Sequence, residues 1–185
     1  ATPGREFFYK VPATGDSVEF EAMDLPDGLS IDRFSGIISG KIAESGDYDV
    51  LIKGIGRKGK TQRQLKIVAG EHRLALTPPM GWNSWNVWGA KVDAGKVREA
   101  ADWMVKTGLI NHGFQYICVD DTWEGKRDED GVLQPNEKFG NMKILGDYIH
   151  AKGLKYGIYS SPGRETCQGF PGSYGYEKID AKTFA

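Results

Sequence analysis

The sequence has few cysteines, few histidines and no excess of charge of either sign. Its 185 residues include two cysteines and three histidines, and the formal net charge at pH 7 is −1. Two cysteines do not build a disulfide framework, and the histidines lack metal-ligand spacing. A nearly neutral chain offers no basic field to a phosphate backbone. We therefore expect no disulfide-stapled scaffold, no metal site and no nucleic-acid partner.

Long hydrophobic runs are also missing. No apolar run approaches the ~18 residues that cross a bilayer, so no membrane span is expected. The N-terminus carries no charged-then-apolar export signal, and its Ala-Thr-Pro-Gly opening is compatible with a mature start after a removed signal. The expected location is secreted or periplasmic.

The first 70 residues follow a period-two pattern. Apolar and polar residues alternate in three stretches, at 18–22, 48–52 and 65–68, which predicts strands with one buried face. Glycine-containing turn signals separate these stretches. Short strands at regular spacing over about 70 residues predict a small β-sandwich for residues 1–70. The segments 25–32 and 35–40 resemble the immunoglobulin-like (Ig-like) modules attached to bacterial surface proteins and glycosidases, which implies a spacer.

From Glu71 onward, strand and helix patterns alternate. A helix capped by Asp93 and ended by Gly108, a second helix ended by Gly153, and strands at 116–119 and 154–159 are predicted. A long polar loop with an Asp130-Gly131 turn inside it is expected at 122–140, and Cys118 is expected to be a buried thiol. This order indicates a parallel α/β arrangement, either a doubly wound sheet or a (β/α)8 barrel. Residues 71–185 fall far short of the ~250 residues of a full barrel, so we expect a truncated one.

One motif points to a different class of protein. Residues 54–61 match the P-loop pattern G-x-x-x-x-G-K-[ST] at every fixed position. Phosphate binding requires a helix that begins at the Gly-Lys-Thr, whereas residues 62–68 that follow end in strand-like alternation. We therefore favour a basic hairpin turn, expect no cofactor, and keep the P-loop NTPase as a distant alternative.

Residues 77–88 contain an unusual density of tryptophan. Trp82, Trp85 and Trp88 fall within seven residues, among amides and a glycine. Aromatic faces pack against pyranose rings, while amides and carboxylates take the hydroxyls. The alternative is that these rings fill the barrel interior, and we favour that interpretation for Trp82 and Trp88.

Asp120 and Asp121 come directly after a buried strand, where barrels and open α/β sheets assemble their sites. Adjacent acids need hydrogen-bond donors, and the neighbouring hydroxyls of a sugar are suitable ones. A helix cap, a solvated loop start or a hard-metal site are open alternatives. Tyr159 ends the next strand, and Cys167 lies in a glycine-rich loop.

In this order the segments closely resemble glycoside hydrolase family 27, the α-galactosidase family, from Leu74 to Ala185. The shared segments are residues 80–86, the Asp pair, 147–155, 166–167 and 179–185. The resemblance implies a retaining, exo-acting glycosidase that hydrolyses terminal α-linked galactose on a (β/α)8 barrel. Its partners would be galactose-containing oligosaccharides or glycoconjugates.

The resemblance also implies roles for single residues. Trp85 would wall the galactose pocket, Asp120 and Asp121 would hold the sugar hydroxyls, and Tyr159 would be a further pocket residue. Cys167 would correspond to a loop cysteine that normally forms a disulfide with a second cysteine, which lies just after the catalytic strand. The sugar stays open between galactose, N-acetylgalactosamine and arabinopyranose, which share the axial hydroxyl.

The family's catalytic residues are absent from this sequence. The nucleophile belongs to a Lys-(Tyr/Phe)-Asp segment on the fourth strand and the acid/base aspartate follows later, and neither position exists here. Retaining glycosidases need both carboxylates. We therefore expect no catalytic residue in this chain and no activity from the chain alone. A truncated barrel also has an unpaired sheet edge, so we expect self-association through that edge. A non-catalytic carbohydrate-binding module is the alternative.

Overall fold

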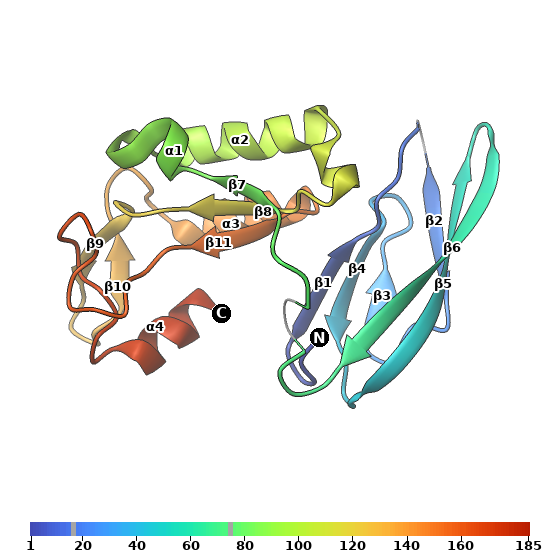
Figure 1. The fold of residues 1–185 in the computed structure, drawn as a ribbon, viewed down its shortest axis with the longest axis horizontal. Coiled ribbons are helices and arrows are strands. Elements are labelled where there is room, and N and C mark those ends of the chain that lie inside the picture. Colours follow the sequence, from blue (N-terminus) through green and yellow to red (C-terminus); the bar gives the residue numbers. More distant parts are fainter. Residues whose placement is uncertain (16–17, 74–75) are drawn as a thin grey trace. The chain divides into compact units, whose positions relative to one another are not determined.

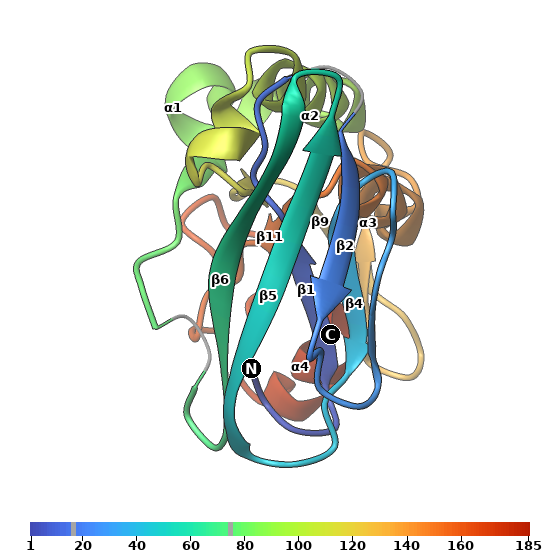
Figure 2. The same ribbon diagram turned by 90° about the vertical axis from the view of Figure 1, so that its right-hand side faces the viewer.

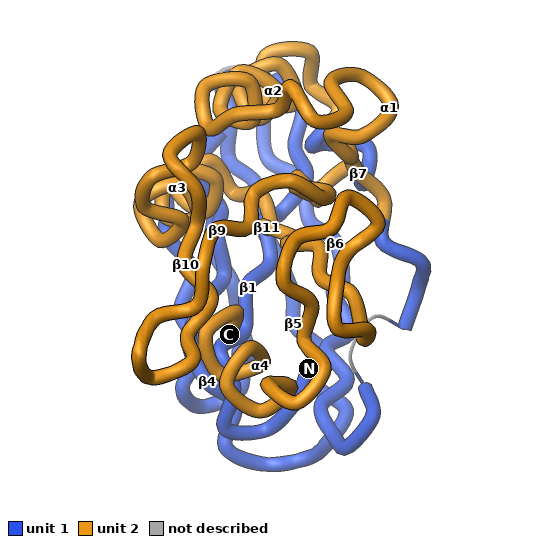
Figure 3. The backbone as a smooth tube through the Cα atoms, turned by 90° about the vertical axis from the view of Figure 1, so that its left-hand side faces the viewer, with its two compact units in different colours: residues 1–79, 110–113 blue, residues 80–109, 114–185 orange. Residues whose placement is uncertain are grey.

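The computed structural model describes residues 1–15, 18–73 and 76–185, which form two compact units (Figure 3). Unit 1 comprises residues 1–79 and 110–113, and unit 2 comprises residues 80–109 and 114–185. The boundary between residues 70 and 71 that the sequence suggests stays a prediction. Leu74, where the family resemblance begins, lies outside the described residues.

Unit 1 consists of two antiparallel sheets of three strands each (Figures 1 and 2). The first has the order β1-β4-β3 and the second the order β2-β5-β6. The strands are β1 (Glu6–Lys10), β2 (Glu19–Met23), β3 (Leu29–Ile31), β4 (Ile37–Lys41), β5 (Gly46–Gly56) and β6 (Gly59–Ala69). The three strands predicted from alternation correspond to β2, β5 and β6, although β5 and β6 extend to 11 residues each.

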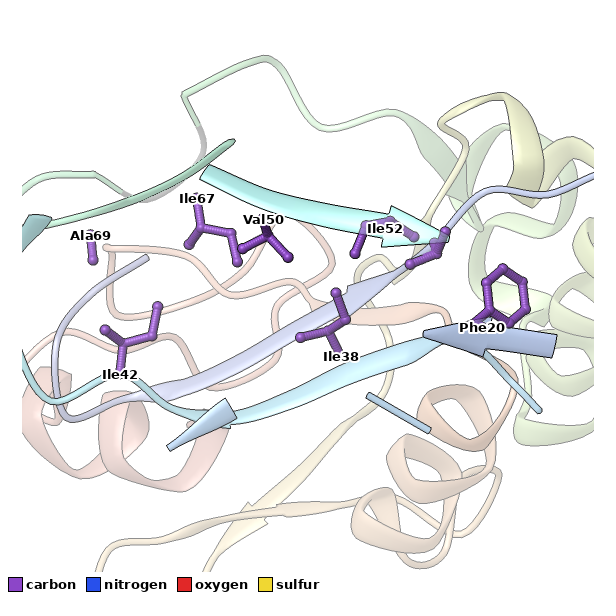
Figure 4. Packing of buried hydrophobic residues seen from close by; sticks show 8 residues of the cluster. Phe20, Ile38, Ile42, Val50, Ile52, Ile67 and Ala69 are labelled. Carbon is purple, nitrogen blue, oxygen red and sulfur yellow. The ribbon is translucent and has the colours of Figure 1, made fainter. Parts of the chain in front are cut away.

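The core of unit 1 lies between these two sheets (Figure 4). Ile38 on β4 and Val50 on β5 have no exposed surface, and Phe20 on β2 is 5% exposed. Because successive strand residues face opposite sides, Val50 and Ile52 point inward while the intervening Leu51 does not. The alternation in the sequence therefore predicted the buried face of unit 1.

The P-loop-like segment forms a β-hairpin. β5 and β6 pair in register from Gly46 with Ala69 to Gly56 with Gly59, so Arg57 and Lys58 form a two-residue turn. Gly59 has φ +135°, a conformation that favours glycine. No helix begins at Lys60, so the P-loop NTPase alternative is wrong: the nitrogens that would cradle phosphate belong to a strand pair.

Unit 2 is built on a parallel three-stranded sheet with the order β11-β8-β7 (Figure 1). Its strands are β7 (Gly81–Asn83), β8 (Tyr116–Val119) and β11 (Lys155–Ile158). The helical segments are α1 (Trp85–Trp88), η1 (Gly89–Lys91), α2 (Ala94–Lys106), η2 (Leu109–His112), α3 (Met142–Ala151) and α4 (Glu177–Phe184). The parallel α/β arrangement is thus as predicted.

The ends of the two main helices also follow the sequence. The side chain of Asp93 accepts a hydrogen bond from the Lys96 N–H at 2.9 Å, as expected for the cap of α2. Asn141 caps α3 in the same way. Gly108 and Gly153 follow the helices with φ of +78° and +82°. A left-handed residue ends a helix, and glycine adopts it without strain.

The helices α2 and α3 cover one face of the sheet. Val97 and Ala101 of α2 and Leu145 of α3 have no exposed surface, and Ile117 of β8 is equally buried. Cys118 is half-buried although its neighbours on β8 are buried, so the prediction of a buried thiol is wrong. Within the described part of the chain, no helix is both long and apolar enough to cross a membrane.

The polar segment 122–140 has the expected Asp130-Gly131 turn but is not the loop that we expected around it. It contains the antiparallel hairpin of β9 (Glu124–Arg127) and β10 (Leu133–Pro135), which turns near Gly131 at φ +79°. Glu124 and Leu133 are buried. The prediction failed because a buried glutamate and two basic residues in β9 conceal the strand pattern.

Candidate functional site

The parallel sheet places the candidate residues at one edge. The strands β7, β8 and β11 run in the same direction, so their carboxyl ends share that edge. Trp85 comes shortly after β7, Asp120 directly after β8 and Tyr159 directly after β11. The Tyr159 N–H donates to the Val119 carbonyl oxygen at 2.9 Å, which extends the pairing of the two strands to the site.

Trp85 is tied to Asp120 through Asn83. The backbone N–H of Trp85 donates to Asn83 Oδ1 at 2.8 Å, and Asn83 Nδ2 donates to Asp120 Oδ2 at 2.8 Å. The hydroxyl oxygen of Ser84, which is fully buried, accepts from the Asp120 N–H at 3.0 Å. The end of β7 therefore fixes both the backbone and the carboxylate of Asp120.

The two aspartates are supplied with donors, as adjacent acids require. The Asp121 N–H donates to Asp120 Oδ1 at 2.8 Å. Asp121 accepts from the Thr122 N–H on Oδ1 at 2.8 Å and from the Gln168 N–H on Oδ2 at 3.0 Å. Asp121 is 2% exposed, whereas Asp120 is half-buried. Asp120 is thus the more accessible carboxylate, and backbone N–H groups offset the repulsion between the pair.

Tyr159 and Cys167 lie together on the other side of Asp121. The Tyr159 hydroxyl donates to Cys167 Sγ at 3.6 Å, and this hydrogen bond is the main reason why the pKa of Tyr159 rises to about 12. Cys167 is an exposed free thiol. Because Gln168 follows Cys167 directly, the Asp121 contact holds this loop against the strand ends.

The five candidate residues are therefore joined by one chain of hydrogen bonds and one peptide link. It runs from Trp85 through Asn83 to Asp120, on to Asp121, and through the 167–168 loop to Tyr159. In the described part of the chain, no group of three or more His, Cys, Asp or Glu side chains is arranged to hold a metal ion.

Of the two tryptophans outside this network, Trp88 differs from the packing interpretation. Trp88 is 38% exposed, with the Lys96 ammonium 5.3 Å from the centre of its ring, so its assignment to the core is wrong within the described residues. Trp82 is half-buried on β7. Two hollows in the surface of unit 2, of about 350 and 550 Å³, are lined by none of the five candidate residues.

Sequence reasoning missed Glu124, which lies three residues after Asp121. Its side chain has no exposed surface, and Oε2 accepts from the Thr122 N–H at 2.9 Å. Burial and, next, the charge of Asp121 raise its pKa to about 7. The alternation of apolar and polar residues that marks a strand is absent around Glu124. We therefore predicted a loop there, and the residue was missed.

Comparisons with known proteins match both units. Residues 77–185 match the family model described as "Alpha galactosidase A", and residues 1–68 match the "Putative Ig domain" model. The alpha-galactosidase A of Cellvibrio japonicus is 52% identical over 115 residues, which is 61% of this chain and 28% of that protein. The chain thus spans less than a third of the length of this relative.

Two solved structures illustrate the similarity. A "putative alpha-galactosidase" from Bacteroides fragilis superposes with a TM-score of 0.94 at 42% identity, covering 99% of this chain and 40% of that one. The alpha-galactosidase from Saccharomyces cerevisiae with raffinose gives a TM-score of 0.58 at 42% identity, covering 60% of this chain and 25% of that one.

Proposed function

The chain belongs to glycoside hydrolase family 27, the α-galactosidase family, and on this premise we propose that its site binds the terminal galactose of an α-galactoside. The α-galactosidase structure with raffinose supports galactose-containing oligosaccharides as ligands. In this proposal the parallel sheet is the first part of a (β/α)8 barrel, and the site lies at the carboxyl ends of its strands.

One observation carries the proposal: the hydrogen-bond chain that joins Trp85, Asp120, Asp121 and Tyr159. Each carboxylate oxygen uses one acceptor position on a protein donor, and a carboxylate offers about four such positions. The remaining positions of the half-buried Asp120 are open to sugar hydroxyls, whereas Asp121, which is 2% exposed, presents little of its surface. The half-buried Trp85 ring supplies the flat apolar surface that a pyranose face requires.

The same geometry argues against a catalytic role for the Asp pair. A retaining glycosidase needs a nucleophile on one side of the anomeric carbon and an acid/base group roughly 5 Å away. Asp120 and Asp121 are neighbours on one strand end and are bonded through the Asp121 N–H. We assign them to holding the substrate, and we expect no hydrolysis by the 185-residue chain alone.

The strands β7 and β11 are the outer strands of the parallel sheet as described. An unpaired strand is a template for pairing with another chain, so we propose self-association through these edges. Sedimentation of the purified chain tests this, and a monomer at all concentrations would contradict it. The secreted or periplasmic location also stays a prediction.

Titration with two sugars tests the binding function. Methyl α-D-galactopyranoside and methyl α-D-glucopyranoside differ only at the 4-hydroxyl, which we expect Asp120 and Asp121 to hold. We expect the galactoside to bind at least about tenfold more tightly, because a site built for one hydroxyl orientation loses a hydrogen bond with the other. Equal affinity, or no binding of either sugar, would contradict the proposal.

Two variants and a matched control locate the site. Trp85→Ala and Asp120→Ala should each abolish galactoside binding, because they remove the apolar surface and the accessible carboxylate. Trp103→Ala is the control: Trp103 is a 50% exposed tryptophan on α2 and takes no part in the hydrogen-bond chain of the site. An aryl α-galactoside assay of the same preparations tests hydrolysis. Turnover by the sequence-verified chain would overturn the expectation that the chain alone is inactive.

A further inference from the structure

Glu124 is a buried carboxyl group beside the candidate site, and the proposed function gives it no role. Its Oε1 is enclosed and has no hydrogen-bond partner among the described residues. Its Oε2 accepts from the Thr122 N–H at 2.9 Å. A buried polar atom without a hydrogen-bond partner destabilises the folded state. We therefore expect Glu124 to have a role in the site that offsets this cost.

The hydrogen bond to Thr122 connects Glu124 with the site. The same N–H also donates to Asp121 Oδ1 at 2.8 Å, so two carboxyl groups converge on one hydrogen. Thr122 has φ +80°, a left-handed conformation that is unfavourable for a β-branched residue. Such a conformation persists only where the surroundings hold it, and the two carboxyl groups are part of those surroundings.

We propose that Glu124 is a positioning residue of the site: its carboxyl group holds the Thr122 N–H and thereby fixes the Asp121 carboxylate. The assignment of Asp121 to a sugar hydroxyl rests on the proposed function. The positioning itself requires only the contacts described here. Loss of the Glu124 proton would place two anions on one N–H without solvent, and Asp121 would shift.

The electrostatic surroundings agree with an uncharged Glu124 below neutral pH. Burial, followed by the negative charge of Asp121, raises the pKa of Glu124 to about 7. Lys138 is a cation close to Thr122: it donates to Thr122 Oγ1 at 3.4 Å and to the Ala90 carbonyl oxygen. Arg127, on the same strand as Glu124, is neutralised by Asp180. The arrangement of Asp121 should therefore change between about pH 6 and pH 8.

Nuclear magnetic resonance of the chain without ligand tests the positioning directly. The amide signals of Thr122 and Gln168 report on the two hydrogen bonds to Asp121. We expect both to shift with a common midpoint near pH 7. Glu124→Gln keeps an acceptor for Thr122 but cannot ionise, so its signals should not move in this range. Glu129→Gln, at an exposed glutamate of the same hairpin, should titrate like the unmodified protein.

The carboxyl carbon signal of Glu124 in the unmodified protein gives the same midpoint and needs no variant. Amide signals that stay constant from pH 5 to 9, or that still titrate near pH 7 in Glu124→Gln, would overturn the inference. A shared midpoint that disappears only in Glu124→Gln would support it.

Sugar binding then separates this inference from the proposed function. We expect methyl α-D-galactopyranoside to bind several-fold more weakly at pH 8 than at pH 6, and Glu124→Gln to bind equally at both. Binding that weakens to the same extent in both proteins would overturn the inference. If no sugar binds at any pH while the amide signals titrate as expected, the proposed function fails and the positioning role stands.

Discussion

Arg127 donates to both carboxylate oxygens of Asp180, from Nη1 to Oδ1 and from Nη2 to Oδ2, at 2.7 Å each. The side chains are only 11% and 3% exposed. Arg127 also donates to the carbonyl oxygens of Gly131 and Gly172, and the Ser173 hydroxyl donates to Asp180. The pair therefore joins the β9–β10 hairpin to the start of α4 and to the loop that follows Cys167.

We expect Asp180→Asn to lower the free energy of unfolding of the chain by about 3 kcal/mol. Breaking a buried pair leaves the Arg127 charge uncompensated, which costs roughly 3–5 kcal/mol. Urea unfolding followed by fluorescence measures the change. Asp147→Asn removes an exposed carboxylate that pairs with Lys143 and should change stability by less than about 1 kcal/mol. Equal effects of the two variants would contradict the prediction.

The stability of the chain should fall between about pH 5 and pH 7. The pKa of Glu124 rises from 4.5 to about 7 on folding, so the folded state keeps a proton that the unfolded state releases in this window. Stability therefore decreases with rising pH, by on the order of 3 kcal/mol in total from this group. Melting temperatures at pH 5 and pH 7.5 measure it. Glu124→Gln should lack this decrease, and an unchanged slope in that variant would refute the assignment.

Asp180 contributes to the pH dependence of stability with the opposite sign to Glu124. The hydrogen bonds from Arg127 hold the pKa of Asp180 below its usual value of 3.8. Its stabilisation is therefore complete above that value and is lost only as the pH falls through the lower pKa of the folded state. The two carboxyl groups act in separate pH windows. Burial lowers the pKa of His150, so this group adds stability as the pH rises within the window of Glu124. The contribution of Glu124 is therefore measured as the difference between the unmodified protein and Glu124→Gln.

The outcome of the sequence analysis depended on how far apart the interacting residues are. Alternation around Val50 and Ile52 predicted the strands of unit 1, because a buried face repeats every second residue. The sequence also placed the Asp pair directly after a strand, and the structure has β8 end at Val119. The contact between Gln168 and Asp121 joins residues 47 positions apart, and no local pattern records it. The hairpin beginning at Glu124 was missed because its buried positions are not uniformly apolar.

ATP should leave the chain unchanged. Residues 54–56 and 59–61 belong to the paired strands β5 and β6, and Arg57 and Lys58 form the turn between them, so this described segment has no helix N-terminus to direct N–H groups at a phosphate. We expect no shift in melting temperature with millimolar ATP and magnesium, in the unmodified protein or in Lys60→Ala. A shift that requires Lys60 would restore the nucleotide-binding alternative.

The two thiols should react with iodoacetamide at different rates. Cys167 is exposed. Cys118 is half-buried, and burial together with the negative charge of Asp120 raises its pKa. Alkylation requires an accessible thiolate, so Cys167 should be modified more than about tenfold faster near pH 7. Mass spectrometry of the digested protein measures both rates, and faster modification of Cys118 would contradict the structure.

Modification of Cys167 should also weaken galactoside binding. The adduct would break the contact with the Tyr159 hydroxyl and displace the neighbouring Gln168, whose N–H holds Asp121 Oδ2. We expect the affinity for methyl α-D-galactopyranoside to fall at least about tenfold after alkylation, which corresponds to about 1.4 kcal/mol, the scale of one hydrogen bond to a charged group. Cys167→Ser should retain affinity and resist the reagent. Loss of binding in alkylated Cys167→Ser would show that the effect arises at Cys118 instead. Full affinity of the alkylated protein would mean that the loop and the Asp pair do not act as one site.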